Sequence, residues 1–110
     1  MKKENKHAGY YEAILQLRPA KREVLDFVDE MLQRKGITIS KIIKLKTGVD
    51  IYVSDQKFAR SVLGPQLKRR FKGELKITRS LYGQNKLTSR LVYRATVLFR
   101  LKAQDIKTEK

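Results

Sequence analysis

The residues of this chain whose types and spacing could do chemistry are cations. Lys68, Arg69 and Arg70 follow one another, and Lys72 comes just after them, at the end of a segment with helical periodicity. Guanidinium forks pair with phosphate oxygens, and each phosphate that a cation neutralises releases condensed counterions. The run therefore indicates either a phosphate-binding patch or the solvated end of a helix, where the helix dipole favours cations.

The distribution of charge along the chain favours binding. Residues 60–102 hold twelve Lys or Arg and one acid, Glu74, a net charge of +11. Residues 1–59 hold twelve Lys or Arg against eight acids, a net charge of +4, and residues 103–110 are neutral. A small domain with one half this basic attracts a polyanion, and we expect that polyanion to be RNA. The predicted RNA-binding residues are Lys68, Arg69, Arg70, Lys72, Lys76, Arg79, Lys86, Arg90, Arg94 and Arg100.

A polar loop is predicted over Tyr82–Ser89, between two basic strands. Gln84 or Asn85 would hydrogen-bond in a nucleic-acid groove, while Lys86 and Arg90 would hold phosphates. The alternative is an ordinary hairpin loop made of turn residues.

Tyrosines could stack on RNA bases if they were exposed on a sheet. Alternation places Tyr11 and Tyr93 on the inward faces of their strands, whereas Tyr52 and Tyr82 could be exposed. The glycine- and aromatic-rich signature of the RNA-recognition motif is missing, so base readout by that mechanism is not expected.

The sequence offers little for catalysis. His7 is the only histidine, cysteine is absent, and no Ser/His/Asp set or phosphate-cradling glycine loop occurs. The acids of the first predicted helix lie on its solvent side, where they serve solubility. We predict no catalytic residue, no metal site, no cofactor and no small-molecule substrate.

No feature of the sequence points to a membrane. The apolar runs are far shorter than the roughly 20 residues that span a bilayer, and the charged start lacks the apolar stretch of a signal peptide. The absence of cysteine fits a reducing compartment. We expect a cytoplasmic protein.

Hydrophobic periodicity predicts five strands and two helices. The strands are predicted over Tyr10–Leu17, Ile37–Leu45, Val49–Val53, Glu74–Leu81 and Arg90–Lys102. The helices are predicted over Lys21–Lys35 and from a cap at Ser54 or Asp55 to Lys72, the second interrupted at Gly64-Pro65. The order β-α-β-β-α-β-β predicts an α+β sandwich of the ferredoxin-like type, with both helices on one face of a mostly antiparallel sheet. Residues 10–102 would form this single domain, between a flexible basic tail over residues 1–9 and a flexible tail over residues 103–110.

Three segments resemble the NMD3 family, the ribosomal large-subunit export adaptors and their archaeal relatives. Tyr10–Arg18 resembles the strand that follows the family's zinc-binding region. Gly48–Ser54, with Phe58-Ala59-Arg60 after it, is similar to the family's G-[FV]-D-[FI]-Y segment and the helix that follows. Thr78–Thr96 resembles the family's basic strand, polar loop and tyrosine-containing strand. The resemblance covers about Tyr10 to Leu101.

This resemblance implies a non-catalytic module that binds the large ribosomal subunit or its precursor. Its partners would be ribosomal RNA, and also ribosomal proteins or other NMD3-type domains. The zinc-binding cysteines, the further β-rich domains and the nuclear transport signals of the family are missing, so neither zinc binding nor export is implied. The chain resembles either a stand-alone archaeal protein or one excised domain. Two other hypotheses remain open at this point: a module that docks an acidic protein, and a small enzyme of RNA metabolism.

Overall fold

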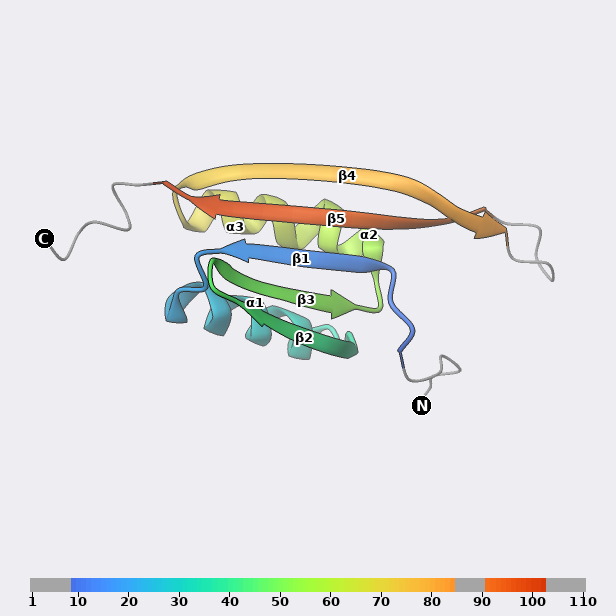
Figure 1. The fold of residues 1–110 in the computed structure, drawn as a ribbon, viewed down its shortest axis with the longest axis horizontal. Helices are drawn as coiled ribbons and strands as arrows, with labels where there is room; N and C mark the ends of the chain where they lie inside the picture. The colour runs from blue at the N-terminus through green and yellow to red at the C-terminus, as the bar shows by residue number, and fades with distance from the viewer. Residues whose placement is uncertain (1–8, 85–90, 103–110) are drawn as a thin grey trace, which may run out of the picture.

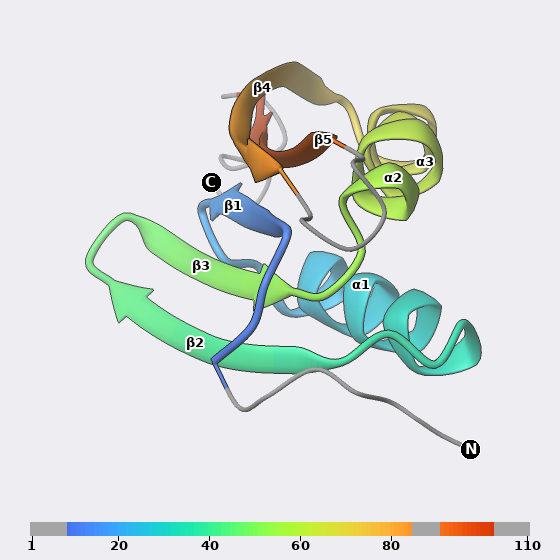
Figure 2. The ribbon, with the colours of Figure 1, turned by 90° about the vertical axis from the view of Figure 1, so that its right-hand side faces the viewer.

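The sheet and the helices that cover it are shown in Figure 1, a computed structural model that describes residues 9–84 and 91–102, apart from the side chains of Tyr82, Gln84 and Val92. The strands are β1 (Ala13–Arg18), β2 (Ile39–Leu45), β3 (Gly48–Val53), β4 (Gly73–Gln84) and β5 (Leu91–Leu101). The helices are α1 (Arg22–Arg34), α2 (Gln56–Phe58), the π-helical η1 (Ala59–Leu63) and α3 (Gly64–Arg70). The α+β class is confirmed, and the helices lie on one face of the sheet (Figure 2). The predicted tails fall outside the described residues, except for Gly9.

The five strands lie in the order β2-β3-β1-β5-β4 and form a mixed sheet. Three neighbouring pairs are antiparallel, but β1 and β5 run parallel, with Ala13 opposite Ala95. The prediction of a ferredoxin-like sheet is therefore only partly met. In that arrangement the strand after the second helix would pair with β1, whereas here β5 lies between them and β4 forms the edge.

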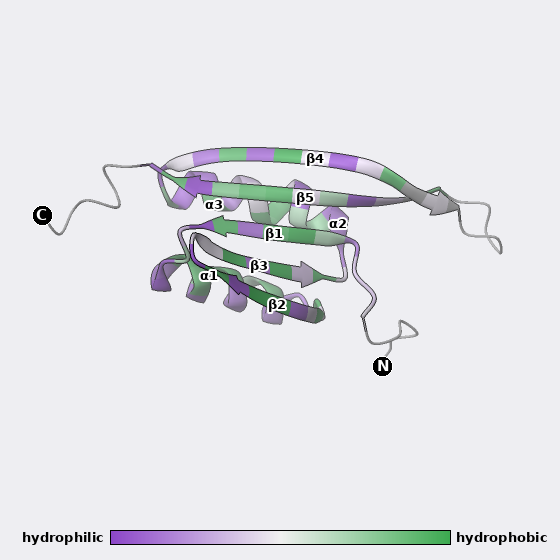
Figure 3. Ribbon diagram, in the orientation of Figure 1, coloured by the Kyte–Doolittle hydropathy of each residue, from purple (hydrophilic) through white to green (hydrophobic). Residues whose placement is uncertain are grey.

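Burial explains why β5, and not β4, lies inside the sheet. The inward side chains of β5 are almost fully buried: Ala95, Val97, Phe99 and Leu101. The inward side chains of β4 that oppose them, Leu75 and Ile77, are only partly buried. The strand with more apolar surface gains more free energy from a central position, and a strand with charged residues suits an edge. Along β4, hydrophilic and hydrophobic residues alternate (Figure 3).

Helix α1 matches its prediction closely. Val24, Val28 and Leu32 are buried at the spacing of one helical face. Gly36, with φ of 69°, ends the helix, and the next amide, of Ile37, donates to the carbonyl of Leu32. This is the glycine-terminated helix end that the sequence indicated.

The second helical segment runs from Gln56 to Arg70 without leaving the helical region. Asp55 caps it, since its carboxylate accepts from the amide of Phe58 at 2.9 Å. The interruption predicted at Gly64-Pro65 takes the form of the π turn η1, in which the amide of Gly64 donates to the carbonyl of Ala59. Proline lacks an amide hydrogen, and the wider turn accommodates that loss. The segment ends at Arg70, two residues before the predicted end.

Two further predictions were wrong in detail. The first strand begins at Ala13, because the chain bends at Glu12. Strand β4 continues to Gln84, three residues beyond its predicted end, with an irregular register between Leu81 and Gly83. Part of the predicted polar loop is therefore strand, and residues 85–89 of it lie outside the described residues.

No helix in the described ranges is long and apolar enough to cross a membrane.

Candidate nucleic-acid interface

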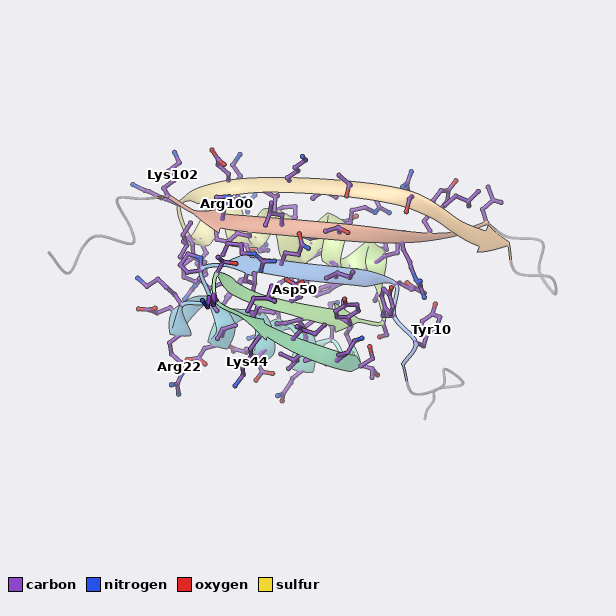
Figure 4. The ribbon with its side chains drawn as sticks, in the orientation of Figure 1. Tyr10, Arg22, Lys44, Asp50, Arg100 and Lys102 are labelled. Carbon is purple, nitrogen blue, oxygen red and sulfur yellow. The ribbon has the colours of Figure 1, made fainter. Side chains whose placement is uncertain are left out.

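The predicted RNA-binding residues that the structure describes fall into two groups. The helix-end group stands where α3 ends and β4 begins: Lys68, Arg69, Arg70 and Lys72. The strand group lies on β4 and β5: Lys76, Arg79, Arg94 and Arg100. Lys86 and Arg90 lie outside the described residues. Lys102 is also exposed at the end of the strand group, and Figure 4 places it with Arg100 toward the same end of the sheet as Arg22.

The strand group does not share one face of the sheet. Residues opposite each other on neighbouring strands point to the same side. Arg79 lies opposite the buried Ala95 and therefore points to the helix side. Lys76, Arg94 and Arg100 point to the open side, where Arg100 lies opposite Glu74, the acid of this half. The structure therefore divides these four cations between two surfaces.

Arg94 is held by contacts within the domain. Its Nε donates to the carbonyl of Tyr11 at 3.2 Å, and its guanidinium lies 3.9 Å from the centre of the Tyr11 ring. The Tyr11 ring meets the Tyr52 ring edge to face at 4.8 Å, and the ammonium of Lys41 lies 4.8 Å from the Tyr52 ring. The prediction that Tyr11 faces the core was wrong, since it lies half-buried against Tyr52, which points to the open face of the sheet.

This row of two tyrosine rings between two cations bears on base recognition. Stacking of bases needs bare aromatic faces on the sheet. Here Arg94 and Lys41 already cover faces of Tyr11 and Tyr52. The open face is thus better suited to phosphate than to bases, which agrees with the missing signature of the RNA-recognition motif.

The far end of the β4–β5 hairpin projects beyond the rest of the sheet. Strand β1 pairs with β5 only from Ala95 to Arg100, so residues 80–84 and 91–94 pair only with each other (Figure 1). We call these residues the projecting hairpin. Leu81 and Leu91 on it are more than half exposed. Arg79 lies 4.5 Å over the ring of Tyr93, which is half-buried and not a core residue as its alternation suggested.

The helix-end group is positioned by the way the chain leaves α3. Phe71 adopts an extended conformation, and its ring meets Phe27 of α1 at 5.8 Å. The guanidinium of Arg70 lies 5.2 Å from the Phe27 ring and 5.9 Å from the Phe71 ring. At Gly73 any side chain would collide with β5, since a Cβ there would lie 2.4 Å from the carbonyl oxygen of Arg100. The beginning of β4, and Lys72 beside it, is thereby fixed against β5.

Acidic groups near these cations have structural partners. Glu12 accepts a hydrogen bond from Tyr10 and a second one from the amide of Gln56 at 3.0 Å. Burial raises the pKa of the Tyr10 hydroxyl above its usual value, and the hydrogen bond to Glu12 raises it further. Within residues 9–84 and 91–102, no three His, Cys, Asp or Glu side chains gather in a way that could hold a metal ion.

Comparison with protein families decides the relationship. The family model for the second domain of NMD3 matches residues 10–101. The chain belongs to the NMD3 family. This match runs from the residues before β1 to the end of β5, so it includes all the strands and helices that the structure describes. The family resemblance predicted over Tyr10 to Leu101 is confirmed.

Membership places the domain in a ribosome-related context. NMD3 proteins are export adaptors that associate with the large ribosomal subunit, and the family is not known as one of enzymes. The comparison with curated proteins gave no match.

Proposed function

We propose that this NMD3-family domain is a non-catalytic module that binds ribosomal RNA of the large subunit, or of its precursor, through the cations of α3, β4 and β5. The proposal rests on one observation: the cations of this half include arginines whose N–H donors are not taken up by carboxylates of the described residues. Residues 60–102 have a net charge of +11, and neither Arg70 nor Arg79 forms an ion pair with a described residue. Their guanidinium faces rest on rings, which leaves N–H donors at the edges for phosphate.

The projecting hairpin is the element best shaped to enter folded RNA. Its two strands pair with each other alone, so it can reach a groove or crevice that the body of the domain cannot. Arg79 stands at its base, and the predicted contacts Lys86 and Arg90 belong to the segment that joins its strands. Backbone phosphates and RNA shape would be recognised, with little preference for sequence.

Sedimentation with ribosomal subunits tests the proposal. The domain, in excess and at low salt, should co-sediment with purified large subunits and not with small subunits. Arg79→Gln should weaken this association several-fold, by analogy with the loss of one phosphate contact. Equal sedimentation with both subunits would contradict the proposal and reduce the domain to a general polycation.

Salt titration tests the contribution of phosphate. If four to six phosphates are contacted, affinity for structured RNA should fall by about two to three decades between about 50 and about 200 mM salt, at roughly 0.7–0.9 per contact. A flat titration would contradict RNA binding. Association that survives digestion with RNase would favour instead an acidic protein as partner.

A further inference from the structure

A hollow of about 400 Å³ lies where the start of α1, the end of α3 and the end of β5 meet. Three cations from separate segments line it: Lys21 from the start of α1, Arg70 from the last turn of α3, and Lys72 before β4. One acid, Glu23, also lines it, and the apolar part of the wall is Val24, Phe71 and Leu101. Lys21 was not among the predicted binding residues, and it lies 49 residues before Arg70 in the chain.

Each of these cations is attached to backbone with a fixed position. The carbonyl of Lys21 accepts the first hydrogen bond of α1, from the amide of Leu25 at 3.0 Å. The carbonyl of Lys72 accepts from the amide of Lys102 at 3.2 Å, which continues the pairing of β4 with β5. Arg70 is held against two phenylalanine rings. A cation on a fixed backbone loses less conformational entropy on binding than a cation on a free tail.

The chemistry of the hollow selects its ligand. A guanidinium presents a planar fork of N–H donors, which matches two oxygens of one phosphate group. Arg70 makes no ion pair with the part of the chain that is described, so no carboxylate there takes up this fork. The ammonium groups of Lys21 and Lys72 add charge without demanding a particular geometry. The net charge of the four ionised side chains that line the hollow is +2.

We propose that this hollow binds one phosphate group of an RNA backbone, with Arg70 as the bidentate donor and Lys21 and Lys72 beside it. The inference rests on the proposed function for the identity of the RNA, and it adds a defined contact to it. Arg79, at the base of the projecting hairpin, lies opposite Ala95, and Ala95 is six residues along β5 from Leu101, roughly 20 Å at the usual rise of a strand. An RNA that reaches both the hollow and Arg79 would contact the domain at two separate places along its longest strands.

Neighbouring arginines provide a matched test. Arg69 and Arg70 are adjacent, exposed and equal in charge, but only Arg70 lines the hollow. Inorganic pyrophosphate should shift the backbone amide signals of Val24, Phe71, Lys72 and Leu101 in NMR spectra. Arg70→Gln should lower the pyrophosphate affinity by about tenfold, as expected for the loss of a charge-assisted pair of hydrogen bonds, whereas Arg69→Gln should change it by less than about twofold.

Two further variants distinguish a loss of pyrophosphate binding from a loss of folding. Arg70→Lys keeps the charge and loses the fork, so it should bind pyrophosphate with intermediate affinity. Lys72→Gln removes a cation that contacts no ring among the described residues, and it should also weaken binding while the thermal unfolding midpoint stays unchanged. Equal losses in Arg69→Gln and Arg70→Gln, or shifts spread over all basic surfaces, would overturn the site.

The same variants separate this inference from the proposed function. In titrations with structured RNA, Arg70→Gln should reduce the salt slope by about 0.7–0.9, the share of one phosphate contact. If the unaltered domain binds RNA and Arg70→Gln leaves both slope and affinity intact, the hollow is not a contact and the proposed function stands. If pyrophosphate binds in the hollow and RNA does not bind at low salt, the proposed function fails and only the anion site remains.

Discussion

The half of the molecule built from β1, α1, β2 and β3 and the half built from α3, β4 and β5 use arginine differently. In the first half, arginines pair with carboxylates, as in Arg18–Asp50 at 2.7 Å, Arg22–Asp26 at 3.5 Å and Arg34–Glu30 at 2.7 Å. In the second half, Arg70 and Arg79 lie over aromatic rings. A carboxylate occupies the N–H donors of a guanidinium, whereas a ring occupies only its face. The N–H donors of these first-half arginines are therefore engaged by carboxylates, whereas Arg70 and Arg79 keep donors with which to bind an anion.

Changes of charge in the two halves should therefore affect different properties, RNA affinity in the second half and stability in the first. Replacing Lys68, Arg69 and Arg70 together with Glu should lower affinity for structured RNA by roughly a hundredfold, because several phosphate contacts are lost and repulsion is added. A triple change of the same charge in exposed first-half lysines, Lys35, Lys44 and Lys46, should cost less than about fivefold, through long-range attraction alone. Fluorescence anisotropy with labelled RNA measures both. Similar losses would mean that the two halves do not differ in binding.

The converse prediction concerns stability. Asp50→Asn should lower the free energy of unfolding by about 2 kcal/mol, because it leaves a largely buried guanidinium without its charged partner. The side chains of Arg18 and Asp50 are each 16% exposed, and Arg18 also donates to the carbonyl of Val49. Chemical denaturation gives the value, and RNA affinity should not change.

A matched control for this change is Asp26→Asn, which breaks an exposed ion pair within α1. Its cost should stay below about 0.5 kcal/mol, since solvent screens such pairs. If both variants lost the same stability, the largely buried Arg18–Asp50 pair would contribute no more than an exposed one.

The last prediction concerns how stability depends on pH, through Tyr10 and Glu12 at the place where the two halves meet. Glu12 accepts from Tyr10, and its carbonyl accepts from the amide of Ala95 on β5 at 2.9 Å. The pKa of the Tyr10 hydroxyl is raised in the folded state, so folding favours the neutral form of this group. The stability that the neutral hydroxyl contributes is complete below the pKa of the unfolded chain, about 10, and is lost as pH rises through the pKa of the folded state. Between about pH 9 and about pH 11, the unaltered domain should lose more stability than Tyr10→Phe, in which this titration is absent. Parallel pH profiles in urea denaturation would contradict the assignment.

Local patterns allowed much of the fold to be predicted. The prediction of α1 was correct within one residue at each end, because its periodic apolar face and the glycine after it depend only on near neighbours. The strands predicted over Ile37–Leu45 and Val49–Val53 were also found close to their predicted bounds, as β2 and β3, which pair antiparallel. The position of β5 between β1 and β4 could not be predicted in the same way, since it depends on how much surface each strand buries against helices far away in the sequence.

For the candidate site, too, local features were predicted from the sequence and long-range contacts were not. Composition alone identified residues 60–102 as strongly basic, because charge is a property of residue type. It did not reveal that Arg94 is held by Tyr11, or that Tyr11 leaves the core, because an aromatic residue that follows strand alternation is usually buried and the bend at Glu12 breaks that alternation.

The sequence by itself determined the α+β class, the helix of residues 22–34, the excess of positive charge and, through its family motifs, the relationship to NMD3. Only the tertiary structure decided which cations lie together. Lys21 joins Arg70 and Lys72 around one hollow, while Arg79 and Arg94 point to opposite sides of one hairpin. The physical reason is that residue types and near-neighbour spacing set charge and local conformation, whereas the meeting of distant side chains depends on which apolar surfaces pack against each other.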